Sequence, residues 1–157
     1  LITSVRDAGI DPGANVYAEL GSTWRFVMSD PMAAAHVLGK LLVHIGPDNI
    51  LWGTDSIWYG SPQDQIESFR AFTISEEFQE RYGYPALTPE GKAKILGLNA
   101  ATLHGLDPAQ GRCRFDAGEL QEIRVERGRK NQTYGPETER AVRLLEARGE
   151  PWERLGA

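Results

Sequence analysis

The sequence contains a single cysteine, Cys113, so the chain cannot form an internal disulfide bond. A lone thiol fits a reducing compartment, and we expect a cytoplasmic protein. No apolar run approaches the ~20 residues needed to cross a bilayer, so we expect no membrane partner. A basic excess is also missing, because the net charge is -5, and this argues against a general nucleic-acid-binding surface.

Histidine is scarce as well. Only His36, His44 and His104 occur, and the motif H-x-H is absent. His36 and His44 are eight residues apart on a predicted helix, so they do not form the i, i+4 pair that shares one metal ion. We therefore interpret all three histidines as structural or surface residues.

What remains is the composition of an ordinary globular protein. Of the 157 residues, 41% are hydrophobic and 25% are charged, which is sufficient for one domain with a sizeable core. Residues 1–8 have the pattern of the last turns of a helix that stops at Gly9. A helix at the first residue leads us to expect that the chain is a piece of a longer protein.

A strand–helix–strand order follows. Residues 15–20 and 50–52 have the composition of strands. Between them, Asp30 and Pro31 form a helix start, and apolar residues recur at helical spacing as far as Gly46. A right-handed crossover places two such strands side by side and parallel, so the sequence predicts an α/β fold.

An acidic residue follows the second strand. The apolar run 50–52 passes through Gly53 and reaches Asp55 two residues later. A carboxylate just past the carboxyl end of a parallel strand lies where barrels and open α/β sheets place their chemistry. Asp is also common in turns, so ending the strand and capping a turn is an equally good interpretation of Asp55.

Two segments resemble motifs of one family. Residues 50–56 (ILWGTDS) resemble the last-strand motif of amidohydrolase-related metal enzymes, a branch that includes hydrolases and decarboxylases. Residues 94–106 (KILGLNAATLHGL) are similar to the closing helix of the same family, and we expect Asn99 to cap that helix. The motifs occur in the family's order about forty residues apart, and the resemblance covers roughly residues 1–106.

The resemblance implies the C-terminal part of a TIM-type (β/α)₈ barrel, with its last two βα units in residues 1–106. A complete barrel needs ~250 residues, more than this chain has. Residues 107–157 then form a helical and β appendage. Within it we expect an edge strand at 122–126 and a helix that starts at residues 135–136. That helix would turn its apolar residues inward: Ala141, Leu144 and Leu145.

The resemblance also implies a metal-dependent hydrolase in which Asp55 is both a metal ligand and the proton acceptor. The implied cofactor is a divalent ion, with zinc expected. The family's other ligands come from an H-x-H on the first strand and from histidines on middle strands, and none is present here. Because catalytic zinc sites use about three protein ligands, we expect the isolated chain to bind metal weakly and to be inactive.

A small-molecule substrate would lie at the ends of the two strands. By the barrel rule, the loop expected at residues 21–23 and the aromatic loop after Asp55 face the active site. The alternative for Glu19 is pairing with a polar group of a neighbouring strand, and for the aromatic rings it is packing on the rim. Ser22 lies in the first loop, and the candidate substrate-binding residues are Glu19, Thr23, Trp24, Ser56, Trp58 and Tyr59.

Three alternatives stay open. The first is a non-hydrolytic carboxy-lyase of the same family. The second is a non-catalytic barrel remnant that binds partners, including a second copy of itself, through unpaired strand edges. The third uses Ser22, Ser56 or Ser61 as a nucleophile, and it ranks low because no G-x-S-x-G motif occurs.

Overall fold

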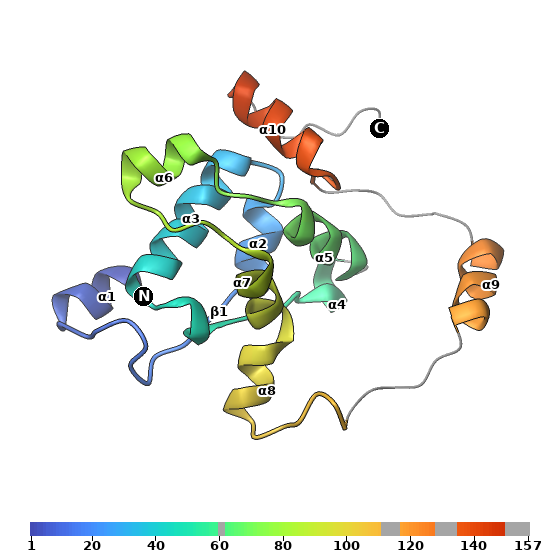
Figure 1. The fold of residues 1–157 in the computed structure, drawn as a ribbon, viewed down its shortest axis with the longest axis horizontal. Helices are drawn as coiled ribbons and strands as arrows, with labels where there is room; N and C mark the ends of the chain where they lie inside the picture. The colour runs from blue at the N-terminus through green and yellow to red at the C-terminus, as the bar shows by residue number, and fades with distance from the viewer. Residues whose placement is uncertain (60–61, 111–116, 128–134, 150–157) are drawn as a thin grey trace.

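The computed structural model describes residues 1–59, 62–110, 117–127 and 135–149. Cys113 and the candidate nucleophile Ser61 lie outside the described residues. In the described part, helices predominate and the sheet has two strands, as Figure 1 shows.

The sheet consists of β1 (Ala18–Glu19) and β2 (Ile50–Leu51), which pair in parallel with Ala18 opposite Ile50. This confirms that the two predicted strands lie side by side and parallel. Both are shorter than predicted. The amide of Asn49 donates to the carbonyl oxygens of Ala14 and Val16, so a side chain, not a neighbouring strand, holds the first part of the 15–20 segment.

Helix α3 (Pro31–His44) connects the two strands, as the sequence predicts. It begins at Asp30, whose carboxylate accepts hydrogen bonds from the N–H groups of Met32 and Ala33. Its buried face packs against α1 (Ile2–Asp7) and α2 (Gly21–Val27). The helix predicted before Gly9 is therefore confirmed as α1, but residues 21–23 begin a helix and do not form the expected loop.

After β2 the described elements as far as α8 are helices of four to ten residues. Thr88 caps α7 by accepting a hydrogen bond from the N–H of Gly91, and Gly83 ends α6 in the left-handed conformation. The remaining bounds are η1 (Pro47–Asn49), α4 (Ser56–Tyr59), α5 (Pro62–Ala71), α6 (Glu76–Tyr82), α7 (Pro89–Ala93), η2 (Lys94–Leu98) and α8 (Asn99–Leu103).

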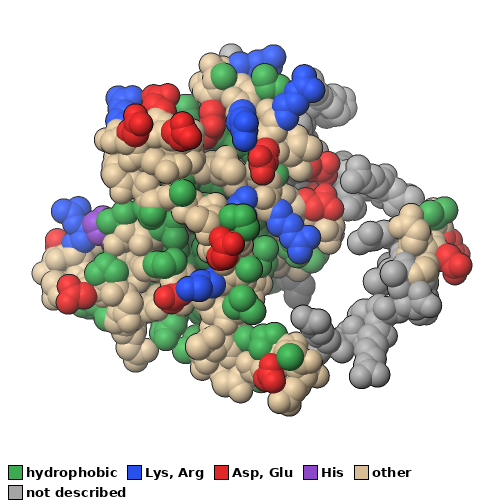
Figure 2. Space-filling model, in the orientation of Figure 1, with side chains coloured by type: hydrophobic (Ala, Val, Ile, Leu, Met, Phe, Trp, Pro, Cys, Tyr) green, Lys and Arg blue, Asp and Glu red, His purple; other side chains and the backbone are tan. Residues whose placement is uncertain are grey.

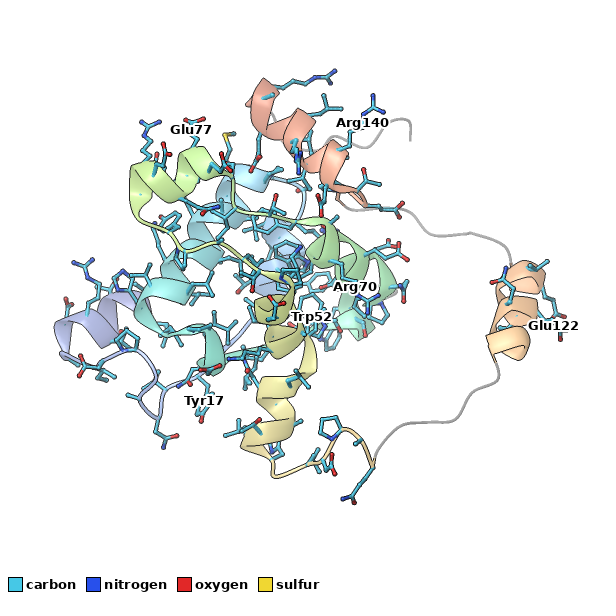
Figure 3. All side chains as sticks on the ribbon, in the orientation of Figure 1. Tyr17, Trp52, Arg70, Glu77, Glu122 and Arg140 are labelled. Carbon is cyan, nitrogen blue, oxygen red and sulfur yellow. The ribbon has the colours of Figure 1, made fainter. Side chains whose placement is uncertain are left out.

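The core lies between the sheet, α2, α3 and α5. At its centre the ring of Trp24 makes edge-to-face contacts with Phe69 and Phe72, at centroid distances of 5.1 Å and 5.6 Å. Trp52 adds a further ring contact to Phe69 at 4.9 Å, and it lies within the body of the molecule in Figure 3. This packing anchors the segment that leads to Asp55.

Asn99 does not cap α8, which corrects the prediction. The residue is buried, and its amide donates to the carbonyl oxygens of Pro47 and Ile50. Leu98 occupies the position before the helix. The amide side chain is turned toward β2 because two backbone carbonyls there need donors.

The predicted strand at 122–126 is wrong, because these residues belong to α9 (Ala117–Arg127). In Figure 1, α9 lies away from the body, and Figure 3 shows its Glu122 there. No strand of the described residues lies beside it, and a strand needs a partner for its backbone groups, whereas a helix satisfies its own.

The last helix, α10 (Glu139–Arg148), starts later than predicted, at the cap Thr138. It packs on α3, and Val142 is fully buried. Of the residues predicted to face inward, Ala141 and Leu145 are half-buried, but Leu144 is 48% exposed, so the prediction is wrong for Leu144. Gly149 ends the helix with a φ of 66°.

Acidic and basic side chains are interspersed over the face shown in Figure 2. Among the described residues, no helix is both long enough and apolar enough to cross a membrane.

Candidate functional site

Asp55 lies on an exposed turn just past the carboxyl end of β2. Its φ is 46°, in the left-handed region, which Asp adopts more readily than most residues. The carbonyl oxygen of Asp55 accepts a hydrogen bond from the N–H of Trp58 at 2.9 Å, which closes the turn into α4. The buried Gln65 donates to the carbonyl oxygen of Thr54 at 2.8 Å, so the backbone before Asp55 is also held.

A serine from the other strand end contacts the Asp55 carboxylate. Ser22 lies in the first turn of α2, directly after β1, and its hydroxyl donates to Oδ2 of Asp55 at 2.5 Å. The hydroxyl of Tyr59 in turn donates to Oγ of Ser22 at 3.3 Å. Parallel strands bring these residues together because both carboxyl ends lie at the same edge of the sheet.

Glu19 contributes a second carboxylate to this edge. Its Oε1 accepts a hydrogen bond from the N–H of Gly21 at 2.9 Å. A methyl group added at Gly21 would lie 2.7 Å from Oε2 of Glu19 and 3.3 Å from Oδ2 of Asp55, and one at Gly53 would overlap Oε1 of Glu19. The two glycines therefore leave the space in which the two carboxylates converge.

The other candidates lie around this group at different depths. Trp58 is 80% exposed, Tyr59 packs edge-to-face on Phe26 at 5.7 Å, and the N–H of Ser56 donates to Oγ1 of Thr54 at 3.3 Å. Thr23 is exposed and, together with Glu19, lines a separate hollow of about 330 Å³ between β1, α1 and α3.

Trp24 does not line the site. Only 1% of it is exposed, and its indole N–H donates to the carbonyl oxygen of Gln65 at 3.0 Å. Because α2 begins at Gly21, helical geometry turns Trp24 toward the core.

The histidines lie on α3 and at the end of α8, and not at the strand ends that carry Glu19 and Asp55. His36 lies on α3, where its Nδ1 is 2.9 Å from the hydroxyl of Tyr84 and its ring contacts Phe78 and Tyr82. His104 is exposed at the end of α8. In the ranges that the structure describes, no three His, Cys, Asp or Glu side chains are grouped as metal ligands would be.

The donor set at this edge therefore does not fit a complete catalytic zinc site. Glu19 and Asp55 offer two carboxylates, whereas such sites use about three protein ligands, usually with histidine among them. Two carboxylates and a hydroxyl group can hold and accept protons, and this is the chemistry that the described residues supply by themselves.

The described groups with shifted pKa values lie on α5, α7 and α10 and at Tyr84, between α6 and α7. Burial raises the pKa of Asp64, and the carboxylates of Glu137 and Glu67 raise it further, against the opposing charge of Arg25. Burial lowers the pKa of Lys92, whose ammonium donates to the carbonyl oxygen of Arg70 at 2.6 Å. These groups are not among the predicted site residues.

Two larger hollows, of about 730 and 870 Å³, lie along η2 and α8. None of the predicted site residues is among the described residues that line them. The site is therefore an exposed edge of the sheet that carries the carboxylates of Glu19 and Asp55.

Sequence reasoning missed two supports of the site. The first is Gln65, which reaches the carbonyl oxygen of Thr54 only because of its position on α5. The second is the contact of Ser22 with Asp55, which are 33 residues apart. The one usable signal was that both residues follow predicted parallel strands.

A family model described as amidohydrolase matches residues 10–106. This range contains β1, β2 and the Asp55 edge. No match was found among curated proteins or among solved structures.

Proposed function

The chain belongs to the amidohydrolase family, and on this premise we propose that it is part of a metal-dependent hydrolase in which Asp55 accepts the proton of the attacking water. The observation that carries the proposal is the position of Asp55, which is exposed past the carboxyl end of β2, inside the matched range. A carboxylate at the end of a parallel strand is well placed for general-base chemistry.

Asp55 also has the geometry that a proton acceptor needs. Ser22 occupies its Oδ2, so Oδ1 is left to face a water molecule or a small-molecule substrate. Ser56, Trp58 and Tyr59 follow on α4 and would border the substrate, with Glu19 and Thr23 on the β1 side.

We further propose that Asp55 supplies one ligand to a divalent ion, with zinc expected. When bound, such an ion polarises a carbonyl group and lowers the pKa of water. Since the described residues do not complete its ligand set, we assign no step to the ion and expect this chain alone to bind it weakly.

The same premise supports a barrel origin for the fold. β1 and β2 would be the last two strands of a TIM-type barrel, with residues 107–157 appended to it. Parallel pairing of β1 with β2, connected through α3, supports this proposal.

One observation favours the second candidate, a module that binds a partner strand. In the described part of the chain β1 pairs only with β2, and the 330 Å³ hollow lies beside β1. Unpaired strand edges bind further strands. This candidate predicts self-association or partner binding that Asp55→Asn leaves unchanged.

The test starts from the coding DNA upstream of Leu1. Suppose that the open reading frame continues upstream and encodes a strand ending in H-x-H. The Asp55→Asn variant of the full protein should then have a kcat about 10²- to 10⁴-fold lower than the wild type and should also lose bound zinc. Asn suits a left-handed φ, so the fold should be kept, and circular dichroism checks this.

Ser4→Ala, on the exposed side of α1, is the control and should leave kcat unchanged. Full activity in Asp55→Asn would contradict the hydrolase proposal. A start codon at Leu1 together with no zinc uptake would favour the partner-binding module.

A further inference from the structure

We propose that Ser22 and Tyr59 are positioning residues for Asp55, forming a relay of two hydroxyl groups that holds Oδ2 and directs Oδ1 to the substrate. The proposal rests on the role given above to Asp55, but it concerns the orientation of the carboxylate and not the reaction itself.

The first link is the hydrogen bond from Ser22 to Asp55. At 2.5 Å it lies at the short end of O–H···O distances, as expected when a hydroxyl donates to a carboxylate. Ser22 is fixed in the first turn of α2. The carbonyl oxygen of Asp55 accepts a hydrogen bond from the N–H of Trp58, and that of the preceding Thr54 accepts one from Gln65, so the backbone here is held as well. Both ends of the link are therefore held before a substrate arrives.

The second link fixes the direction of the first. Because Ser22 donates its only hydroxyl hydrogen to Asp55, its oxygen is free to accept, and the hydroxyl of Tyr59 donates to it at 3.3 Å. Hydrogen bonds in a chain polarise one another, so Tyr59 strengthens the bond to Asp55 without touching Asp55.

The ring of Tyr59 is held from two sides. Phe26 packs edge-to-face on it at 5.7 Å, and the guanidinium of Arg25 lies 5.7 Å from its centre. Both residues belong to α2, which also carries Ser22, so the helix fixes the two hydroxyl groups relative to each other.

The test follows the Asp55 carboxyl carbon by ¹³C NMR in the whole chain labelled at Asp, with the resonance assigned by its loss in Asp55→Asn. We expect Ser22→Ala to move the resonance and Ser22→Thr, which keeps the hydroxyl, to leave it near the wild-type position. Tyr59→Phe alone should also move the resonance. Added to Ser22→Ala, it should cause no further movement, because the effect of Tyr59 passes through Ser22.

In a protein that turns over substrate, Ser22→Ala should lower kcat about tenfold with little change in KM, the effect of losing one hydrogen bond to a charged group. Ser4→Ala and Tyr17→Phe, at exposed positions, should change neither kcat nor the resonance.

A resonance that stays in place in Ser22→Ala would overturn the proposal, and so would a Tyr59→Phe effect that persists in Ser22→Ala. The spectrum decides this whether or not turnover is found. Failure of the hydrolase proposal appears separately, as full activity in Asp55→Asn.

Discussion

At the scale of single residues, two helical glycines differ in what surrounds them. Gly39 lies inside α3 with the ring of Tyr84 against it, and a methyl group there would overlap that ring. Gly91 lies in α7, where a methyl group would make only ordinary contacts, the nearest at 3.6 Å to Oγ1 of Thr88. Helix propensity favours Ala at both positions, so packing decides the difference.

We predict that Gly39→Ala destabilises the protein by about 1–3 kcal/mol, because Tyr84 must move and its contact with His36 is strained. Gly91→Ala should instead leave stability unchanged or raise it by up to about 1 kcal/mol. Urea unfolding measures both. Equal effects of the two substitutions would show that Gly39 is not needed for close packing.

At the scale of elements, Asn99 joins α8 to the segment around β2. Its amide donates to Pro47 and Ile50 at 2.9 Å and 2.8 Å, so one side chain satisfies two carbonyl oxygens from η1 and β2. The residue is buried, and water does not readily replace these bonds.

We predict a loss of about 1–3 kcal/mol in the unfolding free energy of Asn99→Ala, since two carbonyl oxygens lose their donor. Asn99→Asp should lose more, because a carboxylate would then face both oxygens. The exposed Asn15 provides the control, and Asn15→Ala should stay within about 0.5 kcal/mol of the wild type. An unaffected Asn99→Ala in chemical denaturation would contradict the role of this link.

Helix α10 provides the second prediction at this scale, because only one of its apolar residues is fully buried. Val142→Ala should destabilise the protein by about 2 kcal/mol, the effect of removing two buried methyl groups beside α3. Leu144→Ala removes more atoms, but from a residue that is 48% exposed, and should change stability by less than about 0.5 kcal/mol. Thermal unfolding of the two variants tests the docking of α10, and the reverse ranking would show that α10 presents its other face.

At the scale of the whole molecule, stability should depend on pH through Asp64. The side chain is buried, Oδ1 has no hydrogen-bond partner, and burial with Glu137 and Glu67 raises its pKa above the ordinary 3.8. Below that ordinary value the carboxyl is protonated in both states. As pH rises toward the folded pKa, the unfolded chain loses the proton first, so the folded state loses stability.

We predict that Asp64→Asn raises the unfolding free energy at pH ~7 and has little such effect at pH ~3, where Asp64 is protonated in both states. Glu67→Gln, which removes one repulsive carboxylate, should give a smaller gain of the same sign. Denaturant unfolding across this pH range measures both. A gain of equal size at both pH values would show that the titration of Asp64 is not its cause.

The sequence by itself determined the features that act within a few residues. Asp30 begins α3 as the sequence predicts, because a cap contacts backbone groups of its own turn. The parallel pairing of the two strands followed from the connection between them.

The tertiary structure alone decided where side chains find partners far along the chain. It buried Trp24, turned Asn99 toward β2, made residues 122–126 a helix and joined Ser22 to Asp55. The physical reason is that a buried polar group or a strand needs a partner, and the fold, not the neighbouring sequence, determines which groups are within reach.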